Sequence, residues 1–174
     1  MKTFLVLLLT LTSVVVSACE GIESNDCVYE KHNFRFSYDH NWHVEEESGW
    51  FSSPYVFLET EDSGLIMVLL VPKEHNKSLE TFATEYSKTA NSQILLGIFR
   101  SESFSEITSK NKLPGIEEKL NLNIFDEDVP MTRQYFSFSS DDKIAYIIIQ
   151  LDDEELDNLA DLDTVLSSFE FIAK

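Results

Sequence analysis

The chain of 174 residues is poor in cysteine, proline and glycine, with two, four and five of each. Two cysteines allow one disulfide at most, and the scattered prolines and glycines form no repeat or low-complexity block. Basic residues are also few, since 13 Lys and Arg stand against 31 Asp and Glu. Such a chain repels phosphate backbones, so we expect no nucleic-acid partner. The sequence lacks a Gly-x-Ser-x-Gly elbow, a His-Glu-x-x-His helix and a phosphate loop, so we predict no catalytic residues, no cofactor and no enzyme activity.

The N-terminus has the layout of an export signal. Lys2 supplies a positive start, Phe4 to Val16 is apolar apart from three Thr and Ser residues, and Ser17 and Ala18 are small. This order of a charged, an apolar and a small-residue region is typical of a signal peptide. A cysteine, Cys19, follows at once and resembles the lipobox of bacterial lipoproteins, in which the thiol takes a diacylglycerol and becomes the new N-terminus. We therefore predict lipidation at Cys19.

Two other interpretations of this segment were weighed. A membrane-spanning helix needs about 20 apolar residues, and Glu20 and Glu23 follow too soon for that. A plain secreted protein cut before Cys19 would leave that thiol free to pair with Cys27. Because Glu20 is not the aspartate associated with inner-membrane retention in enteric bacteria, the lipoprotein interpretation favours the periplasmic face of the outer membrane.

The sequence divides into a signal peptide (1–18), a short tether (19–27) and one globular domain (28–174), a size that fits a single core. Removal of the signal leaves 12 basic and 31 acidic residues, a net charge of −19. We interpret this charge as a solvated acidic surface, which could also steer in a basic partner. If Cys19 is lipidated, Cys27 is the only remaining thiol, and we interpret it as an unremarkable residue at the start of the first strand, with an intermolecular disulfide as the alternative.

Alternating or continuous apolar runs predict the strands. Pro54 lacks an N–H, so the strand within 50–60 should have it at its start or on an edge. Two runs, 65–71 and 147–149, are apolar on both faces and predict central strands covered on both sides. Residues 140–143 predict the turn of an antiparallel hairpin. Further strands are expected over 34–38, 120–124, 135–139, 144–151 and 169–171.

Two helical regions are expected between these strands. Ser78 is a plausible N-cap for a helix with one apolar face, formed by Leu79, Phe82, Ala83, Tyr86 and Ala90. The acidic run 152–155 suits the positive N-terminal end of a second helix. The apolar residues that follow fall into two sets out of phase, which predicts a bend near Asp161 or two short helices.

Strands in runs, each run followed by a helix, indicate an α+β fold: an α/β/α sandwich with a mainly antiparallel sheet flanked by helices. Residues 33–42, NFRFSYDHNW, resemble the F-x-F-x-Y-P-x-x-W opening of PsbP-like domains, including DcrB-type bacterial lipoproteins, with Asp39 where that family usually has proline. The segments 78–82 and 166–171 extend the resemblance to most of 28–174. It implies the same sandwich fold and accessory proteins without a shared catalytic motif.

Three groups of residues were weighed as sites. His40 and His43 flank Trp42 in a turn and are candidate metal ligands, but their spacing matches no zinc motif, so we expect surface histidines and no metal. Acidic clusters at 126–128 and 141–142 lack the EF-hand spacing and are interpreted as solvated loops. A strip of aromatic residues is interpreted as core packing, with a groove for a peptide or a lipid-like ligand as the alternative. Its members are Trp42, Trp50, Phe51, Tyr55 and Phe57.

The sequence favours a non-catalytic envelope lipoprotein, anchored in the membrane through its lipid, that assists or binds another protein. The alternative is a small-ligand or metal carrier of the cell envelope. No residue of a ligand-binding site can be named from the sequence.

Overall fold

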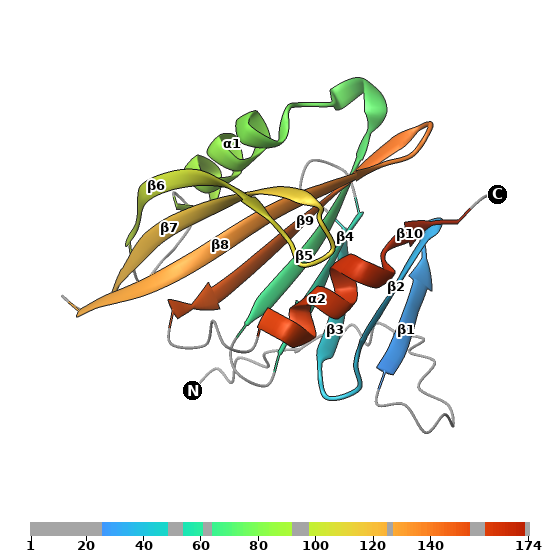
Figure 1. The fold of residues 1–174 in the computed structure, drawn as a ribbon, viewed down its shortest axis with the longest axis horizontal. Helices are drawn as coiled ribbons and strands as arrows, with labels where there is room; N and C mark the ends of the chain where they lie inside the picture. The colour runs from blue at the N-terminus through green and yellow to red at the C-terminus, as the bar shows by residue number, and fades with distance from the viewer. Residues whose placement is uncertain are drawn as a thin grey trace, which may run out of the picture.

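The computed structural model describes residues 26–48, 54–60, 64–91, 98–124, 127–153 and 159–172. Within them, the strands form two antiparallel sheets (Figure 1). The small sheet has the order β1-β2-β10, with β1 at Asp26–Lys31, β2 at Phe34–Asp39 and β10 at Glu170–Phe171. The large sheet has the order β3-β4-β5-β9-β8-β7-β6. Its strands are β3 (His43–Ser48), β4 (Pro54–Glu59), β5 (Leu65–Pro72), β6 (Ile98–Thr108), β7 (Pro114–Ile124), β8 (Glu127–Ser139) and β9 (Lys143–Asp152).

Helices cover both faces of the large sheet (Figure 1). Helix α1 (Leu79–Asn91) lies on one face, and helix α2 (Leu159–Ser168) lies on the other together with the small sheet. A short 3-10 helix, η2 (Lys73–His75), links β5 to α1. This arrangement confirms the predicted α+β sandwich with a mainly antiparallel sheet.

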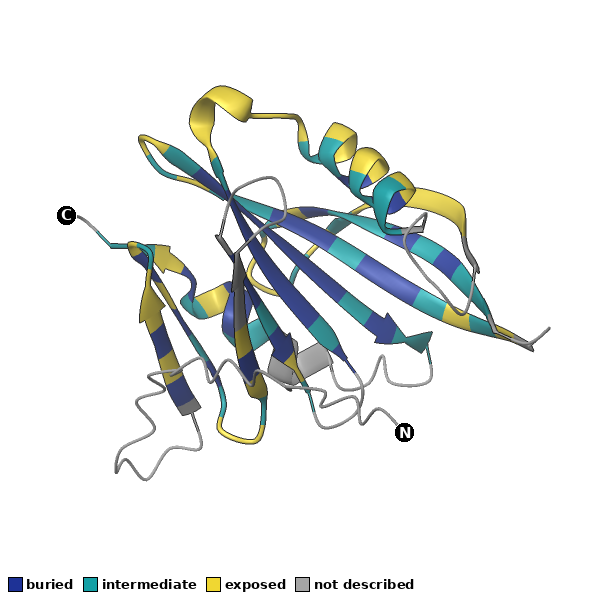
Figure 2. Cartoon of the chain, turned by 180° about the vertical axis from the view of Figure 1, so that it is seen from behind, coloured by how far each residue is buried: buried dark blue, intermediate teal, exposed yellow. Residues whose placement is uncertain are grey.

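The central strands explain why two layers of cover are needed. Ile66 and Val68 of β5 belong to the core on the α2 face, whereas Met67 between them belongs to the core on the α1 face. In β9, Ile147 and Ile148 divide in the same way. Successive side chains of a strand point to opposite faces, so a continuous apolar run must be buried on both. Figure 2 shows these strands as the most buried part of the molecule.

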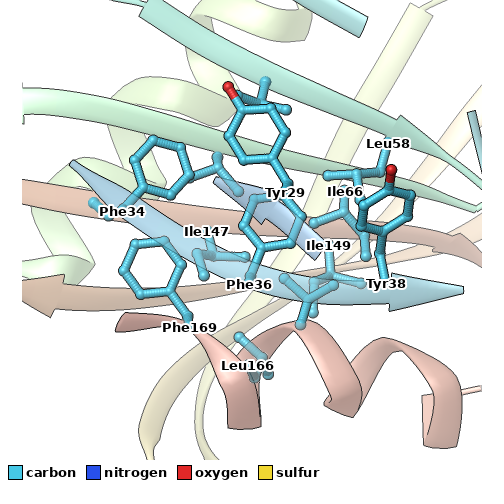
Figure 3. Packing of buried hydrophobic residues seen from close by; sticks show 14 of the residues in the cluster. Tyr29, Phe34, Phe36, Tyr38, Leu58, Ile66, Ile147, Ile149, Leu166 and Phe169 are labelled. Atoms are coloured by element: carbon cyan, nitrogen blue, oxygen red, sulfur yellow. The ribbon is translucent and has the colours of Figure 1, made fainter. Parts of the chain in front are cut away.

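The small sheet closes the α2 face with an aromatic surface (Figure 3). Phe34 and Phe36 of β2 have 0 % and 1 % of their surface exposed. The Phe36 ring stacks on Tyr29 of β1 with centroids 5.0 Å apart, and the Phe34 ring lies 5.5 Å from Phe169. Rings that bury this much area dominate core energetics. The alternation of 34–38 was therefore predicted correctly, and its apolar face joins β2 to the large sheet and α2.

Local sequence signals predicted where several helices and strands begin or end. The Ser78 hydroxyl accepts a hydrogen bond from Thr81 N at 3.2 Å, which confirms the predicted N-cap of α1. Pro54 opens β4, and residues 140–142 form the turn between β8 and β9, where Ser140 N donates to Lys143 O at 2.9 Å. The turn between β1 and β2 has positive φ at both His32 and Asn33, which suits a two-residue hairpin.

Two expectations differ from the structure. The acidic run 152–155 was assigned to a helix start, but Asp152 ends β9 and pairs with Met131, while α2 begins at Leu159 within the described residues. The alternative of two short helices that meet near Asp161 is also wrong, because α2 runs unbroken through this residue. Val165 and Leu166 sit on the buried side of this helix, and contact with the sheet there outweighs the mixed periodicity.

Candidate functional site

A cavity of about 230 Å³ lies on the α2 face, between α2 and the turn that joins β6 to β7. Its apolar part is made by Phe136, Ile149 and Leu166, which are buried, with Ile107 beside them. Gly115 of β7 makes room for this arrangement, because a Cβ there would lie 2.5 Å from the ring of Phe136. The remaining lining residues are Thr108, Ser109, Lys110, Gln134 and Asp163.

The turn above the cavity is fixed by its own backbone. Ser109 N donates to Leu113 O and Lys112 N donates to Ser109 O, both at 2.9 Å. Lys112 has φ of 63°, a left-handed conformation that a non-glycine residue adopts at a cost. The Ser109 hydroxyl accepts a further hydrogen bond from Leu113 N at 3.1 Å. The turn therefore presents Lys110 from a defined backbone.

Two charged side chains of opposite sign line this cavity. Within the described residues, neither the Lys110 ammonium nor the Asp163 carboxylate forms a hydrogen bond or an ion pair, with each other or elsewhere. The neighbouring polar groups of the same face are paired. Gln134 Nε2 donates to Glu117 Oε2 at 3.2 Å, and Lys119 Nζ donates to Thr132 Oγ1 at 2.5 Å.

A second polar cluster is buried under α1, on the opposite face of the sheet. Glu118 of β7 and Arg133 of β8 form an ion pair at 3.1 Å, with side chains 0 % and 1 % exposed. The Glu118 carboxylate also accepts hydrogen bonds from Tyr135 Oη and Ser87 Oγ, each at 2.5 Å. Arg133 donates from Nη2 to Gln150 Oε1 at 2.7 Å. Ser87 belongs to α1, so its bond to Glu118 helps to hold this helix on the sheet. Because the charged groups are sealed from solvent, they do not face a substrate.

Burial and charge shift the titration of this cluster. Burial raises the pKa of Tyr135 and Glu118 raises it further, against the opposing effect of Arg133. Burial alone would lower the pKa of Arg133, but Tyr135 and Glu118 raise it by more. The guanidinium also lies 5.5 Å from the ring centroid of Tyr86. Tyr135 therefore stays a neutral donor and Arg133 a cation.

The predicted lipidation site, Cys19, lies outside the described residues, as do the signal peptide and most of the tether. Cys27 is described: it sits in β1 with 2 % of its surface exposed and is disulfide-bonded. The prediction that Cys27 is a free thiol is therefore wrong for this structure. The sequence contains one other cysteine, Cys19. A sulfur alkylated by a diacylglycerol cannot also belong to a disulfide, so lipidation and an intramolecular disulfide are alternative states of the protein.

The two candidate metal ligands, His40 and His43, lie beside different carboxylates. His40 Nδ1 lies 3.2 Å from Asp39, and His43 Nε2 lies 3.1 Å from Glu45, both at the surface. Across the part of the chain that the structure describes, no three His, Cys, Asp or Glu side chains are grouped as a metal site requires. His40 and His43 thus each lie beside one carboxylate at the surface.

The other candidates are core or loop residues where they are described. Trp42 packs against the α2-face core, and Tyr55 and Phe57 belong to the α1-face core, so these rings do not share one groove. Asp141 and Asp142 are exposed in the β8–β9 turn. Asp128 accepts a hydrogen bond from Asn123 at 2.8 Å. Trp50, Phe51 and Asp126 lie outside the described residues.

Sequence reasoning missed both the cavity and the buried cluster. Glu118 and Arg133 occupy alternating positions in strands, where a charged residue normally indicates the solvent face. Only their opposite signs on neighbouring strands could have suggested a pair. Lys110 and Asp163 are far apart in the chain, and only the bend of the β6–β7 turn toward α2 brings them to one cavity.

The chain matches no protein-family model and no curated protein. Within the described residues, no helix is long and apolar enough to cross a bilayer. Among solved structures, it is similar to cyanobacterial PsbP (CyanoP) from Synechocystis sp. PCC 6803, with a TM-score of 0.57 and 14% identity over 90% of this chain and 98% of that one. LpqN of Mycobacterium tuberculosis, a protein involved in cell envelope biogenesis, matches with a TM-score of 0.46 and 9% identity over 80% and 83% of the two chains. The likeness to CyanoP shows that this chain has a PsbP-like α+β fold.

Proposed function

We propose that this protein is a non-catalytic accessory lipoprotein of the bacterial cell envelope, anchored through Cys19, that binds another protein at the membrane surface. The lipobox-like junction and the resemblance to DcrB-type lipoproteins support the anchoring and the compartment. The anchored form is the state of the protein without the disulfide that the structure has at Cys27. The observation that carries the binding role is strand β6, which offers an uncovered sheet edge. A small-ligand or metal carrier is the second candidate.

Strand β6 is an edge strand of the large sheet. Among the described residues it pairs only with β7, and its residues 100–106 are exposed on both faces. Phe104, at 39 % exposure, is one of two large apolar side chains that stand exposed within the described residues. An edge strand presents unpaired N–H and C=O groups to which an extended segment of a partner can add as a further strand.

The other edges are less suited to such pairing. Strand β3, at the far edge of the large sheet, carries Glu45, Glu46 and Glu47 in succession. Charged side chains on an edge hinder strand addition. Strand β6 also carries charges, at Arg100, Glu102 and Glu106, but serines at 101, 103 and 105 separate them. A bulge lies between Ser101 and Ser103, and β6 pairs regularly with β7 on both sides of it, over 98–101 and 103–108. The longer of these stretches, 103–108, is the proposed docking segment.

The length of the tether limits how far the start of β1 can lie from a lipid on Cys19. β1 begins at Asp26, seven residues after Cys19, and a fully extended chain of that length spans about 25 Å at most. The β2–β3 turn lies beside this point, because Asp26 pairs with Asp39. A lipid on Cys19 would hold this end at the bilayer. The start of β6 and helix α1 lie on the opposite side of the molecule (Figure 1), and the docking segment 103–108 continues from there toward α2.

Site-specific photo-crosslinking in intact cells tests the proposed function. The photoreactive amino acid p-benzoylphenylalanine is placed at Ser103 or Ser105 on β6, with Thr84 on the exposed side of α1 as the matched control. We expect one discrete protein adduct from the two β6 positions and none from Thr84. A Phe104→Lys variant should weaken the adduct, because lysine guards edges against pairing.

Cys19→Ser in the same cells separates the two parts of the proposal. If anchoring brings the partner within reach, the adduct should fall in this variant while the fold is retained. Adducts of equal yield from Ser105 and Thr84, or none from either, would contradict the docking role of β6.

A further inference from the structure

The cavity between α2 and the β6–β7 turn combines three features of a small-ligand site. Its floor is apolar, with Phe136 at 0 %, Ile149 at 2 % and Leu166 at 6 % exposure. Its two walls come from different elements, the fixed turn and α2. A charged group of opposite sign stands on each wall, Lys110 on the turn and Asp163 on the helix. Ligand pockets are typically apolar with few polar groups that set orientation.

The protein itself neutralises neither of the two charges that line this cavity. On other parts of the surface, Lys77 pairs with Glu85 and Lys119 with Asp153. Lys110 and Asp163 line the same cavity without doing so. A molecule that carries a negative and a positive group at one end would satisfy both.

The volume of the cavity suits a small ligand. The cavity of about 230 Å³ is open to solvent and has room for a compact molecule of the size of leucine. An apolar branched group would fit against Phe136, Ile149 and Leu166.

We propose that this cavity binds a free aliphatic α-amino acid of the leucine type. Its carboxylate lies at Lys110, its ammonium group at Asp163, and its side chain on the apolar floor. The cavity adjoins the proposed docking segment, because Ile107 and Thr108 at the end of β6 line it. Leucine binding is measured on the protein alone and does not depend on a partner at β6.

Binding is measured by isothermal titration calorimetry on the full chain in detergent, with three probes. L-leucine carries both charges, leucinamide lacks the carboxylate, and N-acetyl-leucine lacks the ammonium group. We expect leucine to bind about tenfold or more tightly than either analogue, because each lost charge removes a charge-assisted hydrogen bond.

Two variants make the assignment of each charge specific. In Lys110→Met, leucine should lose its advantage over leucinamide but keep its advantage over N-acetyl-leucine. In Asp163→Asn the reverse should hold. Lys88→Met and Asp142→Asn, both at exposed positions away from the cavity, are the matched controls and should bind leucine as the native chain does.

The outcomes decide the proposal. All four positions are at the surface or half-buried, so the variants should keep the native melting temperature. No heat of binding with leucine at millimolar concentration would overturn the site. N-acetyl-leucine binding as tightly as leucine would overturn the free amino acid, because it would mean that the ammonium group is not recognised.

Discussion

Arg133→Met should destabilise the protein by about 3–5 kcal/mol, a large share of the roughly 5–15 kcal/mol that stabilises a domain. The substitution keeps the apolar stem of the side chain but leaves the Glu118 carboxylate, with 0 % exposure, without its cation. Tyr135 and Ser87 would still donate to that carboxylate, but two neutral donors do not replace a charge in a buried site. Chemical denaturation measures the loss.

Two further variants show that the effect comes from the unpaired charge. Glu118→Gln combined with Arg133→Met removes both charges and should be less destabilised than Arg133→Met alone. Lys77→Met breaks an exposed ion pair with Glu85, whose side chains are about half exposed, and should cost about 1 kcal/mol at most. Equal losses in Arg133→Met and Lys77→Met would mean that the buried pair contributes nothing special to α1 docking.

Ile148→Asp should cost about 4 kcal/mol or more. Ile148 is 3 % exposed and belongs to the α1-face core with Tyr135 and Met67. Aspartate there would lose the apolar contacts and bury a second carboxylate on a face whose buried cation, Arg133, is already paired with Glu118. We expect a protein that is largely unfolded at room temperature, seen as a lost melting transition in circular dichroism.

The matched control lies at the end of the same hairpin. Asp142→Asn sits in the exposed β8–β9 turn, and the amide oxygen of asparagine can still accept the hydrogen bond that Ser140 donates at 3.1 Å. Its effect should stay below about 0.5 kcal/mol. A larger loss in Asp142→Asn than in Ile148→Asp would mean that β9 and its turn are assigned wrongly.

The strands that one could predict from the sequence are those whose side chains report their burial. Phe34, Phe36 and Tyr38 alternate with polar residues and became the buried face of β2. The continuous runs in β5 and β9 became the centre of the large sheet. In both cases the residues on the covered faces of the strand are apolar. The apolar pattern in the sequence therefore predicts whether one or both faces of that strand are buried.

The strand that could not be predicted is β6, beyond its first apolar residues. Residues 100–106 are exposed on both faces, so no burial imposes an apolar period on them. Strand β6 is held by its backbone pairing with β7, which leaves no trace in side-chain pattern. The same reasoning explains the cavity, since Lys110 and Asp163 meet only through tertiary structure. The parts of this protein proposed to bind others are therefore those on which the sequence is least informative.

The central claim, anchoring through Cys19, is tested most directly by the intact mass of the protein extracted from membranes, after thiol alkylation in denaturant without reductant. Our account predicts a chain that lacks residues 1–18, carries the added mass of acyl groups, and takes one alkylating group, at Cys27. A mature chain without acyl mass, in which no thiol reacts until reduction exposes both Cys19 and Cys27, would contradict it. That result would establish a secreted protein closed by a disulfide.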